Sequence, residues 1–423
     1  MPTIGAAVLD DFFPALPPLS AEQWAFLSSE TLDRFLGSRP AKVVYCAKCV
    51  QSNQRPRIQF DDEGVCSACR YWERKPTIDW EARADHLSDV LAQHRSKNGS
   101  FDVVVPGSGG KDSAYVSHQL RTRWGMHPLN VTWAPFTYTD IGTRNLQAFV
   151  HSGFDSLVAT PNGQLHRKLT MLSTALVGDP FLPFIWGQYS YAFHMARGLD
   201  IPLVFFGENG EAEYGGSVET EDMPGMPFDA WSDKYWKGVT PASMLKVGTS
   251  IGLISEEEAA SISPFYFPPD DTWTGTALEN YWYGYFVEWR PQDNYFYCAE
   301  NTGFKANPEG RSEATYSKYA SLDDRTDGFH YYFGLLKFGV GRATSDAAHE
   351  VREGLIERDE AIALVERYEL EFPGRNFDFF LDYTGLSREQ FYHLADKFRA
   401  EHLWEKRGDE WALRYPIWET QGT

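Results

Sequence analysis

The stretch FDVVVPGSGGKDSAYVSHQLRTRWG, residues 101–125, decides the fold of this chain. It begins with an apolar, valine-rich run, which is typical of a buried strand. Three glycines then form a tight turn, and the residues from Lys111 onward have the apolar spacing of a helix. A strand, a glycine turn and a helix in this order predict one unit of a parallel α/β sheet.

The same alternation continues after this unit. A second apolar strand is expected at PLNVTWAP, residues 128–135, and a third at DSLVAT, residues 155–160, with the helix RNLQAFVHSGF between them. A helix is expected around 183–198, and IPLVFFGENGEAEYGG, residues 201–216, reads as a strand that ends in a polar turn. Strands and helices at this spacing predict a parallel sheet with helices on both faces.

Charge and composition limit the function classes. The 423 residues carry a net charge of −20 and contain no basic run, so the clustered cations of a nucleic-acid-binding protein are missing. No window is apolar enough to span a membrane, and MPTIGAAVLDDFFPALPP lacks the basic start of a signal peptide. We therefore expect a cytoplasmic protein that binds neither nucleic acid nor membrane and acts on a small or sugar-sized substrate.

The glycine turn is a candidate phosphate-binding loop. It is not a Walker A loop, because Val105 stands where that motif needs glycine and Asp112 where it needs Ser or Thr. The string S-G-G-K-D-S is instead that of the PP-loop ATP pyrophosphatases, which cradle the departing pyrophosphate on backbone N–H groups at a helix N-terminus. The residues predicted to bind the nucleotide are Pro106, Gly107, Ser108, Gly109, Gly110, Lys111, Asp112 and Ser113. The alternative is a glycine turn without a ligand.

Asp112 is a predicted magnesium ligand. A carboxylate beside a phosphate cradle is repulsive unless a cation bridges them, and Mg²⁺ held by Asp112 and the phosphate oxygens removes that conflict. The alternative is an acidic residue that is favoured only by the dipole of the helix start. Lys111 is predicted to neutralise the pyrophosphate.

Four of the five cysteines form two Cys-x-x-Cys pairs separated by sixteen residues: Cys46, Cys49, Cys66 and Cys69. This spacing is typical of a zinc ribbon, and four thiolates leave no open position, so the predicted metal is structural. An iron–sulfur cluster is the alternative, because four cysteines do not by themselves select the metal. Cys298 is interpreted as a buried small hydrophobe.

Three further groups of polar residues are candidates for the site. Because ligands lie over the carboxyl ends of parallel strands, Glu208, Asn209 and Glu211 are predicted to contact ATP, its metal or the acceptor. The alternative for these three is a self-bonded polar turn. The residues Asn162, His166, Arg167 and Lys168 are candidates for phosphate or substrate contacts, with a solvated helix start as the alternative. A second Gly-rich basic element contains the candidates for the triphosphate, Lys337 and Arg342.

These features divide the chain into four predicted parts. Residues 1–40 form an accessory helical segment, with Ser20 as its N-cap and Gly37 as its stop. Residues 41–76 form the four-cysteine zinc module, 77–217 the PP-loop ATP pyrophosphatase domain, and 218–423 a mainly helical region that completes the substrate site. The predicted class is α/β, a parallel-sheet, adenine nucleotide alpha hydrolase-like domain with these additions.

The chain closely resembles the N-acetyl sugar amidotransferases of surface-polysaccharide and flagellin-glycan biosynthesis, the WbpG/PseA type. The resemblance covers about residues 42–375 and is carried by CAKCVQSNQRPRIQFDDEGVCSACR, PGSGGKDS, TPNGQLHRKLT, PLVFFGENGEAEYGG and TYSKYASLDDRTDGFHYYFGLLKFGVGRATSDAAHEVREG. PP-loops alone occur in many enzymes, and the combination with TPNGQLHRK and GENGEAEYGG is the specific part.

The resemblance implies a reaction in which an acetamido oxygen of a sugar or nucleotide sugar attacks the α-phosphorus of ATP. Pyrophosphate leaves, ammonia attacks the O-adenylyl imidate, and AMP leaves behind an acetamidino group. In this reading Lys111 and Asp112 are catalytic, and Glu208 and Glu211 are the candidates for the base. The chain lacks a glutaminase signature, so the resemblance also implies a separate glutaminase with an ammonia-channel subunit.

Two other functions fit parts of the sequence. A tRNA thiolase or another PP-loop sulfurtransferase also joins a cysteine module to this loop, but it usually needs catalytic cysteines near the loop, and only Cys298 is uncommitted. A binding or scaffold protein is a different class, against which the intact loop argues. The sequence does not specify the sugar, its carrier nucleotide, the oligomeric state or the role of residues 1–40.

Overall fold

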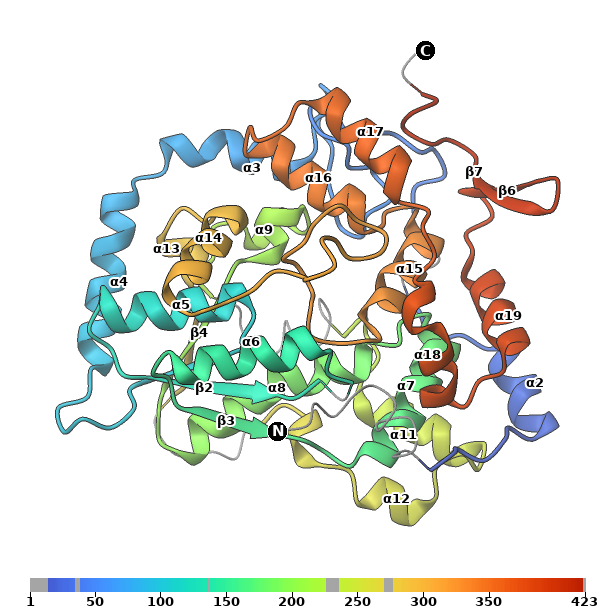
Figure 1. The fold of residues 1–423 in the computed structure, drawn as a ribbon, viewed down its shortest axis with the longest axis horizontal. Coiled ribbons are helices and arrows are strands. Elements are labelled where there is room, and N and C mark those ends of the chain that lie inside the picture. The colour runs from blue at the N-terminus through green and yellow to red at the C-terminus, as the bar shows by residue number, and fades with distance from the viewer. Residues whose placement is uncertain (1–13, 35–38, 136, 226–235, 270–276, 421–423) are drawn as a thin grey trace.

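The computed structural model of the chain describes residues 14–34, 39–135, 137–225, 236–269 and 277–420. Figure 1 shows one central sheet surrounded by helices, with the cysteine module and the C-terminal helices along its upper and right-hand sides. Gly37, the predicted stop of the first helix, and the first thirteen residues lie outside the described part.

The sheet has five parallel strands in the order β3-β2-β1-β4-β5. β1 is central, because Val104 pairs with Leu129 on one side and with Val204 on the other. The chain fills one side of β1 with β2 and β3 before it returns to β4 and β5, so the strand order reverses between β1 and β4. In open α/β sheets, ligands bind at the carboxyl ends of the strands beside such a switch point. The strands are β1 Val103–Pro106, β2 Pro128–Trp133, β3 Ser156–Ala159, β4 Leu203–Phe206 and β5 Glu279–Trp282.

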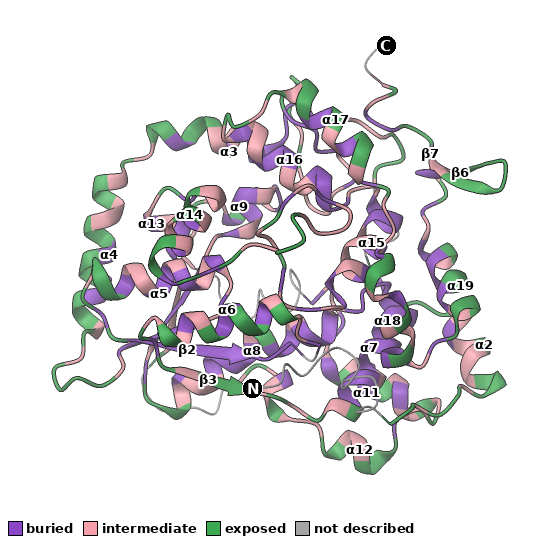
Figure 2. Cartoon of the chain, in the orientation of Figure 1, coloured by how far each residue is buried: buried purple, intermediate pink, exposed green. Residues whose placement is uncertain are grey.

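The valines of β1 show why this segment is a buried strand. Side chains alternate between the two faces of a sheet. Val104 packs into the cluster formed with helices α7 and α8, whereas Val103 and Val105 pack into the opposite cluster with α4 and α5. Both faces of β1 are therefore buried, as Figure 2 also shows for β2 and its neighbour α8. The predicted α/β class with a doubly covered parallel sheet is confirmed.

Helices make up most of the remaining structure, and the predicted helical C-terminal region is confirmed. The longer helices are α2 Ala21–Ser29, α3 Ser67–Arg74, α4 Trp80–His94, α5 Lys111–Thr122, α6 Asp140–His151, α7 Gly163–Val177, α8 Leu182–Gly198, α11 Pro241–Ser250, α14 Pro291–Asn301, α15 Asp327–Phe338, α16 Arg342–Arg352, α17 Arg358–Tyr368, α18 Phe377–Thr384 and α19 Arg388–Phe398. The short ones are α9 Gly210–Tyr214, α12 Glu256–Ala260 and α13 Tyr283–Phe286, with single 3-10 turns at Lys75–Thr77, Val218–Thr220, Pro264–Tyr266 and Gly374–Asn376.

The C-terminal region contains strands that the sequence did not predict. The sheet does not end near residue 217, because β5 at Glu279–Trp282 pairs in parallel with β4 and belongs to the same sheet. The C-terminal region also contains an antiparallel hairpin of β6 Trp404–Arg407 and β7 Glu410–Leu413. The predicted cap of the first helix is present, since the Ser20 side chain accepts a hydrogen bond from the Gln23 N–H.

The cysteine module packs on the C-terminal helices rather than standing apart. Cys46, Cys49, Cys66 and Cys69 share one buried cluster with Ala347 of α16 and with Ala361 and Ile362 of α17. Figure 1 shows α3, at the end of this module, beside α16 and α17 at the top of the molecule. Segments some 300 residues apart in the sequence are therefore joined in one apolar core.

Among the described residues, no single helix has both the length and the apolar character that a membrane crossing requires. Helices α7 and α8 meet that test only when they are taken together, and they are bent by 119° at the break between them.

Candidate functional site

The loop between β1 and α5 has the geometry of a phosphate cradle. Gly109 has a φ of 86°, a backbone conformation that favours glycine, and a β-carbon there would lie 2.6 Å from the Cα of Leu146. A β-carbon at Gly107 would lie 2.1 Å from the Ser113 side chain. Both glycines are therefore required for this path of the chain.

The N-terminus of α5 presents backbone donors at this loop. Gly110 is its N-cap, and no side chain of the described residues bonds to the first-turn N–H groups of α5 in the manner of a cap. Such N–H groups, together with the positive end of the helix dipole, favour an anion. The start of α5 therefore has the features of an anion-binding helix terminus.

Lys111 and Asp112 lie together at the start of α5. The Lys111 ammonium contacts both carboxylate oxygens of Asp112, at 2.7 and 2.6 Å. Burial opposes the charge of Lys111, but Asp112 outweighs it and raises the pKa of the lysine, so Lys111 is a cation. The two residues are close enough to serve one phosphate and its metal, and without a ligand they neutralise each other.

Glu208 lies beside this pair, at the carboxyl end of β4. A β-carbon on Gly207 would come within 3.7 Å of the Asp112 β-carbon, which places the two loops next to each other at the switch point. Burial and the neighbouring Asp112 raise the pKa of Glu208 to about 7, although Lys111 acts in the opposite direction. Glu208 can therefore exchange a proton near neutral pH.

A second group of carboxylates reaches the loop from the C-terminal region. A β-carbon at Gly142 would lie 2.5 Å from the Asp323 Cα, so this segment sits directly on α6. Burial raises the pKa of Asp323, and the nearby Ser108 side chain of the loop acts in the opposite direction. Burial raises the pKa of Asp327 to about 7. Burial also raises the pKa of Asp346, and the positive charge of Lys111 acts in the opposite direction.

Sequence analysis did not identify Asp323, Asp327 or Asp346 as site residues. Asp323 and Asp327 belong to the acidic string DDRTD, residues 323–327, which is visible in the sequence, but the position of this string beside the loop depends on the fold of the whole chain. Arg342, predicted to reach the triphosphate, does lie in this region. Its guanidinium is 3.6 Å from the Asp327 carboxylate and lies over the Tyr331 ring.

Lys337 lies elsewhere. Its ammonium is buried against the Asp33 carboxylate at 2.8 Å and the carbonyl of Val177 at 2.9 Å. These contacts join the N-terminal segment to the end of α7. The structure therefore does not bring Lys337 to the loop, and its predicted role with the triphosphate has no geometric support.

Glu211 and Asn209 shape α9 instead of facing the loop. The Glu211 carboxylate is bound by Arg57 at 2.5 and 3.1 Å and accepts from the Ser217 N–H at 2.6 Å. Asn209 caps α9, since its side chain accepts from the Glu211 N–H and donates to the Thr220 carbonyl. Of the candidate bases, Glu208 is the one that the structure leaves beside Asp112.

The candidates after β3 lie on α7. Asn162 is its N-cap and accepts hydrogen bonds from the N–H groups of Gln164 and Leu165. His166 is buried against the Tyr266 hydroxyl at 2.7 Å, and burial lowers its pKa to about 3, so the ring is neutral. The helix start is thus structured by these residues, and the structure does not bring them to the phosphate loop.

Arg167 and Lys168 follow on the same helix. Arg167 donates to the carbonyls of Tyr383, Asp382 and Pro14, and so ties α7 to α18 and to the N-terminal segment. Lys168 pairs with Glu258 of α12 at 2.6 Å and lines a cavity of about 480 Å³.

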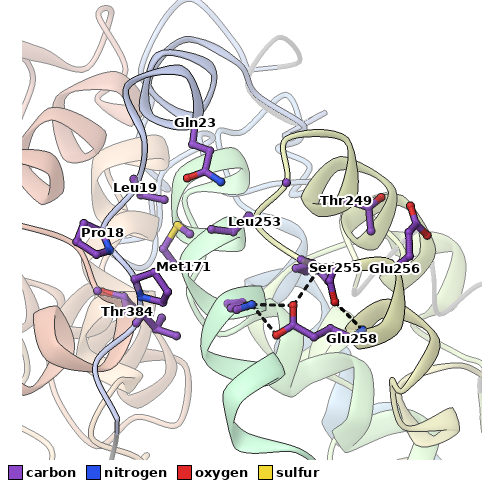
Figure 3. Close-up of a pocket in the computed structure, with 16 residues that line it drawn as sticks. Pro18, Leu19, Gln23, Met171, Thr249, Leu253, Ser255, Glu256, Glu258 and Thr384 are labelled. Atoms are coloured by element: carbon purple, nitrogen blue, oxygen red, sulfur yellow. Dashed lines mark hydrogen bonds and ion pairs between the residues drawn. The ribbon is translucent and has the colours of Figure 1, made fainter.

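That cavity is shown in Figure 3, where Pro18, Leu19, Met171 and Leu253 form its apolar wall and Glu258 points into it. None of its lining residues belongs to the phosphate loop, to α9 or to α15. The cavity is therefore separate from the nucleotide cradle.

The four cysteines form a metal-binding arrangement, as predicted. Their Sγ atoms all lie within 4.8 Å of one another, all four side chains are buried, and the Cys46–Cys69 and Cys49–Cys66 sulfur distances are both 3.8 Å. Backbone N–H groups of Lys48 and Gln51 point at the sulfurs of Cys46 and Cys49. The donor set fits a four-thiolate metal ion such as zinc, held without an open position.

Arg352 and Arg358 complete the surroundings of this centre. Arg352 lies 3.9 Å from the Cys49 sulfur and also donates to the Glu213 carbonyl of α9 at 2.9 Å. Arg358 donates to the carbonyls of Cys49 and Cys46. A four-thiolate centre with a divalent metal carries a net negative charge, which these guanidinium groups offset.

Comparison with protein families identifies a related C-terminal domain. Residues 313–416 match the family model described as LPS biosynthesis protein WbpG-like, C-terminal domain. No curated protein matches the chain. The matched segment contains Asp323, Asp327, Arg342 and Asp346, which are the residues that the C-terminal region contributes beside the loop. The match confirms the WbpG-type resemblance, and the parallel sheet with its glycine loop is consistent with the PP-loop superfamily.

Proposed function

We propose that this chain, a member of the WbpG-like proteins, is an ATP-dependent and AMP-forming amidotransferase of lipopolysaccharide or related glycan biosynthesis. Its substrate would be an N-acetylated sugar or nucleotide sugar, whose acetamido group becomes an acetamidino group. The observation that carries the proposal is the cradle formed by Gly107–Ser113 at the switch point of the sheet, directly beside Glu208 and the carboxylates of the WbpG-like domain.

The loop residues account for the first half of the reaction. The N–H groups at the start of α5 would bind the pyrophosphate, Lys111 would neutralise it, and Asp112 would exchange its contact with Lys111 for a magnesium ion. Catalysis in such a site comes from positioning and from the stabilisation of charge on the phosphates.

The substrate amide must lose its N–H proton when its oxygen forms the bond to the α-phosphorus. Glu208 is placed to accept this proton, because it lies beside Asp112 and its pKa of about 7 leaves much of it ionised at neutral pH. The products of this half are the O-adenylyl imidate and pyrophosphate. Ammonia then displaces AMP, and we propose that a separate glutaminase with a channel subunit supplies it.

The sulfur-transfer alternative has less support. Cys298 is fully buried, its thiol donates to the Lys111 carbonyl at 3.1 Å, and burial raises its pKa to about 12. Nucleophilic cysteines instead have a depressed pKa and an accessible sulfur. Cys298 therefore supports the position of the loop.

Mass spectrometry of a reaction with ATP, Mg²⁺, ammonium chloride and a panel of N-acetylated sugars and nucleotide sugars tests the proposal. We expect AMP and pyrophosphate together with an acceptor in which the amide oxygen is replaced by NH. Formation of ADP and phosphate would overturn the adenylation mechanism, and sulfur in the product would establish the alternative.

A further inference from the structure

His330 and Asp179 form a buried carboxylate–imidazole pair that the proposed chemistry has not yet used. The Nδ1–H of His330 donates to Oδ1 of Asp179 at 2.7 Å. Asp179 is 1% exposed, whereas the His330 side chain is 31% exposed. One nitrogen of the ring is thus fixed by a buried carboxylate, and the opposite nitrogen, Nε2, has no hydrogen-bond partner among the described residues.

Asp179 is held ionised in this position. Burial alone would raise its pKa, but Lys237, which also pairs with Asp179, and His330 outweigh burial and keep the pKa of this carboxyl well below its usual range. The backbone N–H of Phe181 donates to the same carboxylate at 3.0 Å. An ionised carboxylate with this fixed position orients an imidazole and stabilises its protonated form.

The pair lies on the side of the site from which the C-terminal carboxylates come. His330 and Asp327 are three residues apart on α15 and therefore share a face of the helix, separated by about one turn, roughly 5 Å along the axis. Asp327 begins α15, directly after the segment in which Asp323 lies against Gly142 of α6 and near Ser108 of the loop. Burial raises the pKa of the Asp327 carboxyl and the charge of His330 acts in the opposite direction, so the imidazole and this carboxylate belong to one group of neighbouring side chains.

The charged groups around His330 come from three places. Asp179 and Lys237 face it from the segment after α7 and from the segment before α11, and Asp327 lies on its own helix. Lys337, also on α15, is directed at Asp33 and acts on Asp179 at longer range. The Phe181 ring, 5.5 Å from the imidazole between centroids, covers one side of it.

We propose that His330, positioned by Asp179, is the acid–base residue of the second half-reaction, in which ammonia displaces AMP. As the C–N bond forms, Nε2 takes a proton from the nitrogen. As the C–O bond to the phosphate breaks, His330 returns that proton to the product, which leaves as an amidinium cation while AMP leaves as an anion. No proton is gained or lost overall, and the ionised Asp179 stabilises the imidazolium during the step.

This assignment rests on the proposed function, and it separates two proton transfers. Glu208 lies on the phosphate side and serves the formation of the adenylate, whereas His330 serves its aminolysis. The nearby carboxylate of Asp327 adds negative potential where the amidinium develops.

The test measures the two half-reactions separately in full-length protein. Exchange of labelled pyrophosphate into ATP, dependent on the acetamido sugar and run without ammonium, reports the first half. Amidine formation with ammonium chloride reports the whole reaction. For His330→Gln we expect exchange within about twofold of wild type and a loss of amidine formation of about 10²–10³-fold.

Two further variants distinguish a chemical role from a structural one. In His330→Ala, added imidazole should restore part of the amidine formation, which a packing defect would not allow. Asp179→Asn should lower amidine formation in the same direction, and its sugar-dependent exchange reports whether the protein is folded. His118→Gln is the control, because the His118 imidazole also contacts side-chain hydroxyl groups, those of Tyr297 at 2.7 Å and Thr122 at 3.5 Å, but no carboxylate, and it should leave both half-reactions unchanged.

The outcomes are distinct. Amidine formation within threefold of wild type in His330→Gln would overturn the proposal, as would an equal loss of both half-reactions without rescue by imidazole. If the wild-type protein showed no sugar-dependent exchange with any acceptor, the proposed function would fail and this assignment would fail with it.

Discussion

Arg57, in the segment between the two cysteine pairs, binds both carboxylate oxygens of Glu211, the second residue of α9. The metal module therefore holds the element that directly follows Glu208. Lys75 pairs with Glu213 at 2.8 Å and Arg352 binds the Glu213 carbonyl, so α9 is fixed from two sides. These contacts connect the position of Glu208 to the integrity of the metal centre.

Replacing Arg57 should destabilise the protein. Glu211 is buried, so Arg57→Met leaves a carboxylate without its main partner, and we expect a loss of about 2–4 kcal/mol in the free energy of unfolding. Urea denaturation measures this loss. Arg70→Met is the matched control, because its pairs with Asp61 and Glu63 are exposed and screened by solvent, so their loss should change the free energy of unfolding much less. Equal losses in the two variants would contradict the clamp on α9.

Removing the charged residues of the loop should abolish turnover without unfolding the protein. Lys111→Ala deprives the pyrophosphate of its cation, and Asp112→Ala deprives the metal of its ligand, so kcat/KM should fall at least about 10²–10³-fold in each. Formation of AMP measures the effect, and circular dichroism reports the fold. Lys406→Ala, on the β6–β7 hairpin, should be neutral. Full activity in both loop variants would end the assignment of the phosphate loop.

Gly109→Ala should disturb the cradle itself. The new methyl group would approach the backbone of α6 at Leu146 to 2.6 Å, at a backbone conformation that alanine avoids, so we expect a loss of about 2 kcal/mol or more and weaker ATP binding. Thermal unfolding with and without MgATP measures both effects. Gly163→Ala meets no atom within 4 Å and serves as the control. A Gly109→Ala protein that still gains stability from MgATP as wild type does would contradict the cradle.

Substitution of a cysteine in the metal centre should have a different effect from substitution of Cys298. Cys66→Ser removes one of four buried ligands, so the protein should lose its metal and much of its stability, because binding of a structural metal contributes folding free energy. Elemental analysis of the purified protein measures the metal and also distinguishes zinc from iron. Cys298→Ser should keep the metal and the activity, and a loss of activity in this variant would favour sulfur transfer.

The raised pKa of Glu208 makes stability depend on pH with a definite sign. The unfolded carboxyl ionises near its ordinary pKa of 4.5, and the folded one near 7, so the folded state binds more protons between these values. Stability contributed at this position is therefore lost as pH rises from about 4.5 to about 7. At pH 8 the free energy of unfolding of Glu208→Gln, measured by urea denaturation, should exceed that of wild type by about 3 kcal/mol, and the difference should vanish near pH 4.5.

The same pKa predicts the activity profile. Glu208 accepts a proton only when it is ionised, so sugar-dependent pyrophosphate exchange should rise as pH passes through about 7, and Glu208→Gln should flatten that rise. A wild-type profile without this limb, or one that Glu208→Gln leaves unchanged, would remove Glu208 from the first half-reaction.

Local patterns in the sequence predicted the parts of the site that local structure determines. The loop Gly107–Ser113 follows from a valine strand, a glycine turn and a helix, and Glu208 follows from the rule that ligands lie at strand ends. The four cysteines follow from their spacing alone. Each of these features depends on residues within one turn or one motif, so neighbouring letters are sufficient to recognise it.

The remaining parts depend on distant contacts that spacing does not reveal. The alternation of residues could not show that Lys337 faces Asp33, or that Lys168 pairs with Glu258, since both depend on which helix packs against which. Asp323 reaches Ser108 across more than 200 residues of chain. β5, Glu279–Trp282, likewise joins the sheet through its pairing with β4, more than 70 residues earlier in the chain.

The C-terminal segment that matches the WbpG-like model is thus interleaved with the nucleotide fold. A polypeptide cut before residue 313 would retain the glycine loop but lack the carboxylates of Asp323, Asp327 and Asp346. It would also leave the apolar side of the cysteine module uncovered. Neither fragment would be an autonomous enzyme. Two separately expressed fragments would have to reassociate before they could be active. The C-terminal segment is therefore an integral part of the fold and not a separate domain that could be exchanged between proteins.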